Sequence, residues 1–160
     1  AKMAFDAENH YGKPVNIEFG IEKKPYLLQA RDVTTLGREI RIFDLKGEIV
    51  LKGFGISNGL GIGKVNVVRN ANSNFENGDV LVAESLNVDL FPLIKRAKGV
   101  VVNEGGCLSN MGILCRELGV PVVVHENATL ELRNGLIVSV DGYMGRVYRG
   151  EAKMKGIIDN

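Results

Sequence analysis

The segment 104–110 carries the residues best suited to chemistry in this sequence. Gly105 and Gly106 follow an apolar run, and Ser109 and Asn110 precede a stretch with helical spacing. A glycine pair between a buried strand and a helix exposes N–H groups at the helix N-terminus, where an anion or a phosphorylated side chain is held readily. The same pattern fits an ordinary capped helix start, with Ser109 or Asn110 as the cap. Spacing alone leaves both interpretations open.

Other polar residues give weaker signals. His125 follows an apolar run and His10 stands beside Tyr11, and lone histidines in such places are usually solvated loop residues. Glu18 and Arg31 are expected on neighbouring strands, where they could face a nucleotide and its metal or form an ordinary ion pair. Neither pattern decides between these roles.

A glycine-rich turn occupies residues 55–63, with glycines at 55, 59, 61 and 63. Its spacing matches neither a Walker loop nor a dinucleotide fingerprint, because a strand follows it instead of a helix. It therefore favours a tight turn that closes the edge of a β-structure.

Composition limits the classes of protein. The chain has 160 residues, a formal net charge of +1 and 45% hydrophobic residues, which suits one compact domain with a small appendage. The balanced charge removes the compositional case for nucleic-acid binding, and no apolar run approaches the roughly 20 residues of a membrane-spanning helix. Two cysteines, Cys107 and Cys115, and no apolar leader indicate reduced thiols in a cytoplasmic protein.

Between residues 80 and 124 the pattern alternates between strands and helices. Valine-rich runs at 80–83, 100–102 and 120–124 predict buried strands. A helix capped by Asn87 or Asp89 is expected to run through residue 97. A second is expected over 110–118, with Arg116 and Glu117 pointing away from its apolar face. Such a β-α-β-α-β order requires at least one parallel strand pair.

The flanks of this segment read as β-structure. Runs at 15–19 and 26–30 predict a hairpin, and because two strands alone are marginal in water, this piece is expected to belong to a larger sheet. Residues 36–54 read as a connector. Near the C-terminus, Asp141 and Gly142 predict a turn between strands at 136–140 and 145–148.

Several of these segments resemble one family when taken in order. They are similar to the phosphohistidine swivelling domain of phosphoenolpyruvate synthase and pyruvate phosphate dikinase, the PEP-utilising enzymes. Residues 10–35 resemble the C-terminal edge of that family's ATP-grasp nucleotide-binding domain. The segments that carry the resemblance to the swivelling domain are 57–65, 78–84 (GDVLVAE), 92–97 (PLIKRA), 104–106 (EGG) and 116–123 (RELGVPVV).

The resemblance implies an α/β fold, a swivelling β/β/α phosphohistidine domain preceded by a small β-hairpin and linker. It divides the chain into an ATP-grasp remnant at 1–35, a linker at 36–54, the swivelling domain at 55–150 and a tail at 151–160. The implied partners are the ATP-grasp domain and the barrel domain that binds PEP or pyruvate, in the same enzyme or in a partner subunit. Nucleic acid and membrane are not among them.

In that family the ATP-grasp domain phosphorylates a histidine of the swivelling domain, which then carries the phosphoryl group to the barrel. The resemblance implies that Glu18 is a metal and nucleotide ligand, with Gln29 and Arg31 beside the phosphates. Mg²⁺ and ATP are therefore the cofactors of a full-length parent. None is expected for this chain alone, and the chain alone is expected to be inactive.

The sequence departs from the family at the phosphoacceptor. The family pattern is Gly-Gly-x-Thr-Ser/Cys-His-Ala-Ala-Ile, and this chain has Asn110 at the histidine and Leu108 at the threonine. An amide is not a nucleophile at neutral pH, so no catalytic residue is assigned. Gly105, Gly106, Ser109 and Asn110 remain as a helix-terminal anion site.

Three interpretations follow from this departure. The domain is a silent docking, regulatory or structural module, or one subunit of a split phosphotransferase. Alternatively, it is a working domain with an engineered substitution, which Leu108, Met111 and Gly112 argue against because they also depart from the pattern. In the third, the helix start only binds an anion in an unrelated chemistry.

Overall fold

The computed structural model describes residues 2–33 and 42–158, which fall into two units divided after residue 39. Each unit is described by itself. Residues 34–41, which include the end of the expected ATP-grasp remnant and the start of the expected linker, lie outside the described residues.

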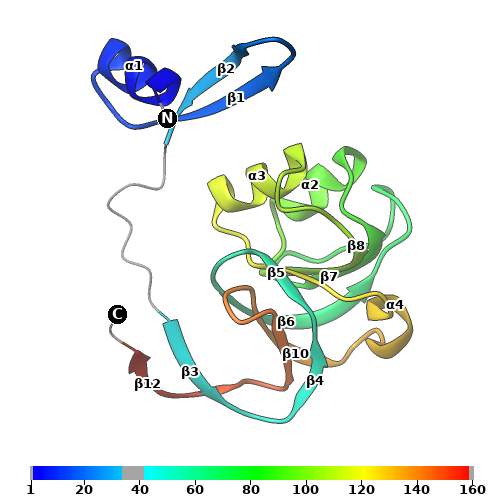
Figure 1. Ribbon diagram of the computed structural model, residues 1–160. Coiled ribbons are helices and arrows are strands. Elements are labelled where there is room, and N and C mark those ends of the chain that lie inside the picture. The colour runs from blue at the N-terminus through cyan, green and yellow to red at the C-terminus, as the bar shows by residue number, and fades with distance from the viewer. Residues whose placement is uncertain (1, 34–41, 159–160) are drawn as a thin grey trace. The chain divides into compact units, whose positions relative to one another are not determined.

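The first unit contains a helix and a hairpin (Figure 1). Helix α1 spans Lys2–Tyr11, and strands β1 (Val15–Ile21) and β2 (Pro25–Asp32) pair antiparallel as predicted. The sequence did not predict α1, which has no acidic residue in its first turn to mark its start. Ala7 is the only buried side chain among those described in this unit, so its apolar core is very small.

The second unit is built on an eight-stranded mixed sheet in the order β4-β11-β10-β6-β7-β8-β9-β5. Strands β6 to β9 are parallel to one another, and the other neighbours are antiparallel. This arrangement confirms the predicted parallel core and the hairpin at Asp141 and Gly142. The strands are β4 (Ile49–Lys52), β5 (Phe54–Ser57), β6 (Leu60–Val67), β7 (Val80–Ser85), β8 (Gly99–Glu104), β9 (Val122–Val124), β10 (Ile137–Asp141) and β11 (Arg146–Arg149).

Two apolar cores lie on the two faces of the parallel strands. Helices α2 (Phe91–Ile94) and α3 (Asn110–Leu118) cover one face, where Met111 and Cys115 pack against Val100. On the other face, Val82 and Val101 pack with Val138 and Val147 of the antiparallel strands, and with the short helix α4 (Ala128–Glu131). The layers are thus β/β/α, as the family resemblance implied.

The predicted helix ending near residue 97 is shorter than expected. It consists of a 3-10 turn, η1 (Val88–Leu90), followed by α2, and single turns continue to Ala97, whose N–H donates to the Ile94 carbonyl. Asn87 is the cap, because its side chain accepts from the Asp89 N–H at 3.1 Å. Pro92 in the first turn of α2 costs no hydrogen bond there.

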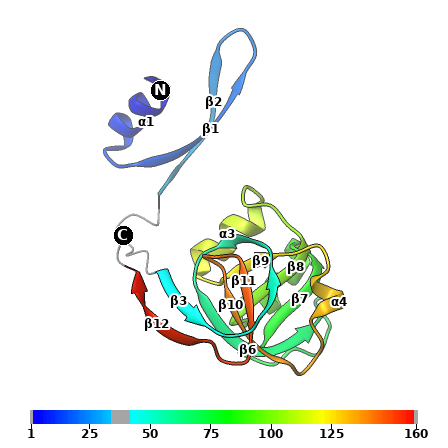
Figure 2. The same ribbon diagram turned by 60° about the horizontal axis from the view of Figure 1, so that its bottom comes forward.

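The sheet curls so far that its two edges approach each other. Its edge strands, β4 and β5, are consecutive in the chain and separated only by Gly53, and β10 contacts β8 and β9 although neither is its neighbour in the sheet (Figure 2). The backbones meet where β5 passes the turn after β10: a Cβ on Gly55 would overlap the Gly142 carbonyl oxygen, and a Cβ on Gly142 would overlap the Ser57 carbonyl oxygen. The glycine-rich turn thus serves this closure.

Strands also occupy ranges that the sequence assigned to a linker (36–54) and a tail (151–160). Strand β3 (Ile42–Lys46) and strand β4 lie in the first range, and β12 (Lys153–Ile158) lies in the second. β3 and β12 pair antiparallel in a two-stranded sheet. Because the partner of β3 lies more than 100 residues away, no local pattern reveals the pairing.

We expect Gly142→Ala to destabilise the second unit. A Cβ at this position overlaps the carbonyl oxygen of Ser57 and lies 3.0 Å from Pro121, so the loss in free energy of unfolding is about 1–3 kcal/mol, as for overpacked interiors. Urea unfolding measures it. The matched control is Gly106→Ala, where the nearest atoms lie at 3.9 and 4.0 Å; equal stability of the two variants would contradict the tight closure.

Candidate functional site

The candidate site is the loop 105–109 and the first turn of α3, at the carboxyl end of β8. Ser109 is the N-cap: its Oγ accepts from the Gly112 N–H at 3.0 Å and donates to the Gly106 carbonyl at 2.7 Å. The structure therefore decides between the two caps that the sequence left open. Asn110 is the first helical residue. At its other end α3 stops at Gly119, which has a left-handed conformation (φ 70°).

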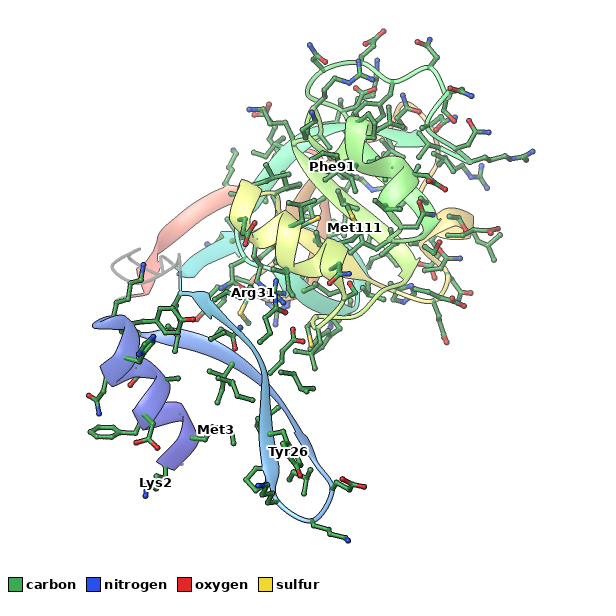
Figure 3. The ribbon with its side chains drawn as sticks, turned by 90° about the horizontal axis from the view of Figure 1, so that it is seen from above. Lys2, Met3, Tyr26, Arg31, Phe91 and Met111 are labelled. Atoms are coloured by element: carbon green, nitrogen blue, oxygen red, sulfur yellow. The ribbon has the colours of Figure 1, made fainter. Side chains whose placement is uncertain are left out.

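Asn110 stands at the exposed tip of this arrangement. Its side chain is exposed and makes no hydrogen bond with another described residue. The next residue, Met111, turns into the core under α3 (Figure 3). Position 110 is thus a solvent-facing position on a firmly packed helix.

The loop lies unusually close to its own helix. A Cβ on Gly112 would lie 2.5 Å from the Gly106 carbonyl oxygen and 3.1 Å from Ile56 Cγ2. A glycine inside a helix costs about 1 kcal/mol relative to alanine, and here it permits this approach. The pattern of the family that the sequence resembles has alanine here, and the Cβ of an alanine would not fit this loop conformation without a shift.

Arg116 is a functional candidate that sequence reasoning missed. It was expected to point away from the apolar face, yet it is half-buried and donates to the Ile56 carbonyl at 3.0 Å and the Cys107 carbonyl at 2.7 Å. Helical spacing describes only where the Cβ points, whereas a long arginine side chain reaches neighbouring elements. No sequence signal marks these two acceptors, because both are backbone carbonyls.

The loop also borders exposed apolar side chains. Leu108 is 87% exposed and Val88, in η1, is 69% exposed. A Cβ on Gly105 would lie 3.2 Å from Ile56 Cδ1 and 3.4 Å from Leu86 Cβ, so the backbone here runs close to both side chains. The turns that follow β7 and β8 therefore lie beside β5.

His125 does not supply a free nucleophilic nitrogen. Its Nδ1 accepts from the Asn127 N–H at 3.2 Å, which assigns the proton of the neutral ring to Nε2. Neither nitrogen of this tautomer has a free lone pair. His10 lies in the first unit on α1, in an edge-on contact with Tyr11.

Glu18, Gln29 and Arg31 come together on the first unit's hairpin. Glu18 pairs with Gln29 across the strands, and Arg31 Nη2 donates to Glu18 Oε1 at 2.8 Å (Arg31 is labelled in Figure 3). Both charged side chains are at least one-third exposed, so this pair adds little to stability. No group of three metal-ligating side chains occurs among the described residues.

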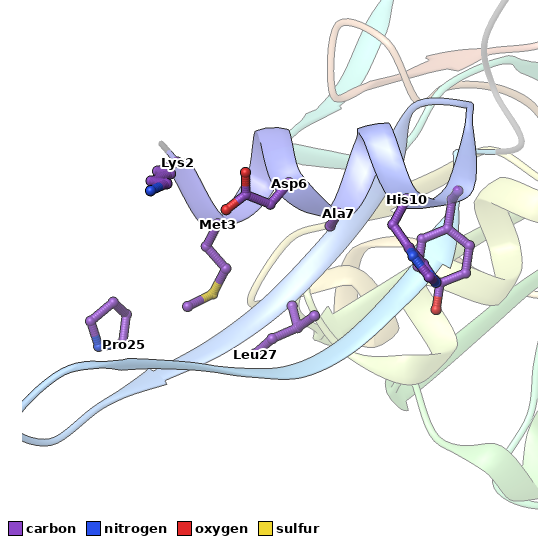
Figure 4. Close-up of a pocket in the computed structure, with 8 residues that line it drawn as sticks. Lys2, Met3, Asp6, Ala7, His10, Pro25 and Leu27 are labelled. Carbon is purple, nitrogen blue, oxygen red and sulfur yellow. The ribbon is translucent and has the colours of Figure 1, made fainter.

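The first unit also holds a mainly apolar cavity of about 650 Å³ between α1 and β2 (Figure 4). It contains none of the three hairpin residues above. Its lining is Lys2, Met3, Asp6, Ala7, His10, Tyr11, Pro25 and Leu27.

Comparison with known proteins identifies the second unit. Residues 75–145 match the family model described as PEP-utilising enzyme, mobile domain. These residues belong to that family of mobile domains. This mobile domain, with its flanking segments, is 41% identical over 96% of the chain to phosphoenolpyruvate synthase of Pyrococcus furiosus. It is also 41% identical over 92% of the chain to the probable phosphoenolpyruvate synthase of Archaeoglobus fulgidus.

The chain spans about a fifth of these relatives, 20% and 21% of their lengths. The fold of the mobile domain also resembles that of a UPF0107 protein solved by solution NMR, with a TM-score of 0.50 over 63% of this chain and 98% of that chain. At 15% identity this likeness concerns the fold alone. Among the described helices of the chain, none has the length and apolar character needed to cross a membrane.

The two thiols of the mobile domain are expected to react very differently. Cys107 is exposed, whereas Cys115 is buried, and burial raises the pKa of the Cys115 thiol to about 11, which the nearby Arg116 only partly offsets. Iodoacetamide at pH 8 should modify Cys107 alone in the native protein and both thiols in urea, because the thiolate is the reactive form. Mass spectrometry measures this, and equal native rates would contradict the packing of α3.

Proposed function

We propose that the mobile domain acts as a docking and positioning module of a phosphoenolpyruvate synthase-like phosphotransferase without carrying the phosphoryl group itself. The observation that carries this proposal is Asn110 at the first position of α3, where the family pattern has its phosphoacceptor histidine. Phosphoryl transfer through this position needs a neutral imidazole as nucleophile. An amide nitrogen has no available lone pair and takes no phosphoryl group.

No neighbouring side chain replaces the missing imidazole. The Ser109 hydroxyl is engaged in capping α3 and donates its proton to a carbonyl, and no described histidine lies within hydrogen-bond distance of it. His125 has the tautomer that leaves no nitrogen free. These contacts favour a domain that carries no phosphoryl group (a silent carrier) over one that carries it on another residue.

Residues of the first unit favour its assignment to a nucleotide-binding domain. Glu18, Gln29 and Arg31 share one region of the β1–β2 hairpin, and carboxylate, amide and guanidinium groups suit Mg²⁺ and nucleotide phosphates. We assign residues 2–33 to the C-terminal edge of an ATP-grasp domain, which would bind Mg²⁺ and ATP in a longer protein. Its partners would be the remaining ATP-grasp segments and a barrel domain for PEP or pyruvate, in the same chain or another subunit, in the cytoplasm.

We expect the chain alone to form no phosphoenolpyruvate from ATP, Mg²⁺ and pyruvate. Neither a full nucleotide site nor a barrel is present, so neither half-reaction has a complete site. A coupled assay with full-length Pyrococcus furiosus phosphoenolpyruvate synthase as positive control measures this. Formation of product by the chain alone would refute the assignment.

Substitution at position 110 tests the silent-carrier proposal. Asn110→His, incubated with ATP and an intact ATP-grasp partner from the same family, should gain an acid-labile phosphate, whereas the natural chain and Asn110→Ala should not. Labelling of the natural chain would contradict the proposal. Phosphate titration of the natural chain, followed by amide NMR shifts at 105–112, tests the alternative of a simple anion-binding module.

If correctly folded Asn110→His stays unlabelled, the next test changes the residues around position 110. Adding Leu108→Thr, Met111→Ala and Gly112→Ala restores the rest of the family pattern. Labelling of that variant would mean that the loop has been remodelled for docking. Its failure would count against the proposal that position 110 and this loop are what separate the domain from a phosphoryl carrier.

A further inference from the structure

Arg116 joins three separate parts of the mobile domain. It lies on α3, and its two terminal nitrogens bond the carbonyl of Cys107 in the loop and the carbonyl of Ile56 in β5. Within the described residues, no other side chain hydrogen-bonds both this loop and β5. The guanidinium is therefore the link between the loop and the edge of the sheet.

The other contacts of the loop act only locally. The bonds among Gly106, Ser109 and Gly112 connect the loop to its own helix, so they fix the turn without fixing its place on the sheet. At the tip, Cys107 and Leu108 are exposed, and they contribute no buried anchor. Gly105 runs near Ile56 and Leu86, but it has no side chain to restrain the loop.

We propose that Arg116 is a positioning residue, which holds the loop 105–109 against β5 and thereby sets the orientation of the side chain at position 110. The inference rests on the proposed function, because orientation at 110 matters where that face meets a partner domain. Arginine suits this role since its planar fork presents two N–H donors in a fixed geometry, and both acceptors here are carbonyls. A lysine in its place keeps the charge but has no such fork.

The first arm of the test uses the natural chain and needs no activity. Arg116→Gln should raise the hydrogen-exchange rate of the loop amides by about tenfold, the scale of one lost charge-assisted bond. Arg116→Lys should give an intermediate rise. Exchange in β7 and β8 and the urea midpoint should change little. The control is Glu117→Gln, an exposed neighbour on the same helix.

The second arm adds the same substitutions to Asn110→His. With the ATP-grasp partner, Arg116→Gln should lower the maximal labelling rate of the introduced imidazole while the half-saturating partner concentration stays the same, and Arg116→Lys should restore part of the rate. If Arg116 only supported the fold, both substitutions would lower the labelling rate in proportion to their loss of stability. The rate would then not fall selectively at a constant half-saturating concentration.

The outcomes separate the two proposals. Unchanged loop exchange in Arg116→Gln would overturn the positioning role. A loosened loop with an unaltered labelling rate would overturn it as well. If Arg116→Gln loosens the loop but Asn110→His is never labelled, Arg116 still holds the loop. That result would count against the proposed phosphotransferase function instead.

Discussion

The closure of the curled sheet is the constraint on which the rest of the mobile domain depends. Because one residue separates β4 from β5, the first and last strands of the sheet must lie together. That is achieved where the turn after β10 crosses the end of β5 with backbone against backbone, at Gly142 and Ser57. The crossing fixes β5, β5 supplies the Ile56 carbonyl, and that carbonyl is one of the two acceptors through which Arg116 holds the candidate loop.

The parallel strands form a buried base beneath the exposed candidate site. Their valines are buried on both faces, as is usual for parallel strands. The loop that precedes Asn110 follows the carboxyl end of one of them, β8. A carrier or docking domain needs such a division, because its contact residues must face solvent while their backbone stays fixed. The side chain of Asn110 is exposed and Met111, its neighbour, is in the core.

The first unit presents the opposite case. Among its described residues, one buried side chain and a two-stranded hairpin give it little core of its own, and a two-stranded hairpin is marginal in water. Phe19, Ile21 and Leu28 are each more than half exposed. These properties agree with the proposal that residues 2–33 complete a larger nucleotide-binding domain, whose remaining segments would cover this apolar surface.

The sequence by itself determined the elements whose signals are local. Gly105, Gly106 and Gly119 marked both ends of α3, Asp141 and Gly142 marked the last hairpin, and the valine runs marked the parallel strands. The prediction that Asn110 stands where the family has its histidine also comes from sequence alone, because a motif depends on residue order. What only the tertiary structure decided involves distant partners: β3 with β12, and Arg116 with Ile56, 60 residues away. Such contacts depend on how the sheet curls, and a side chain that bonds a backbone carbonyl leaves no trace in the identity of its partner residue.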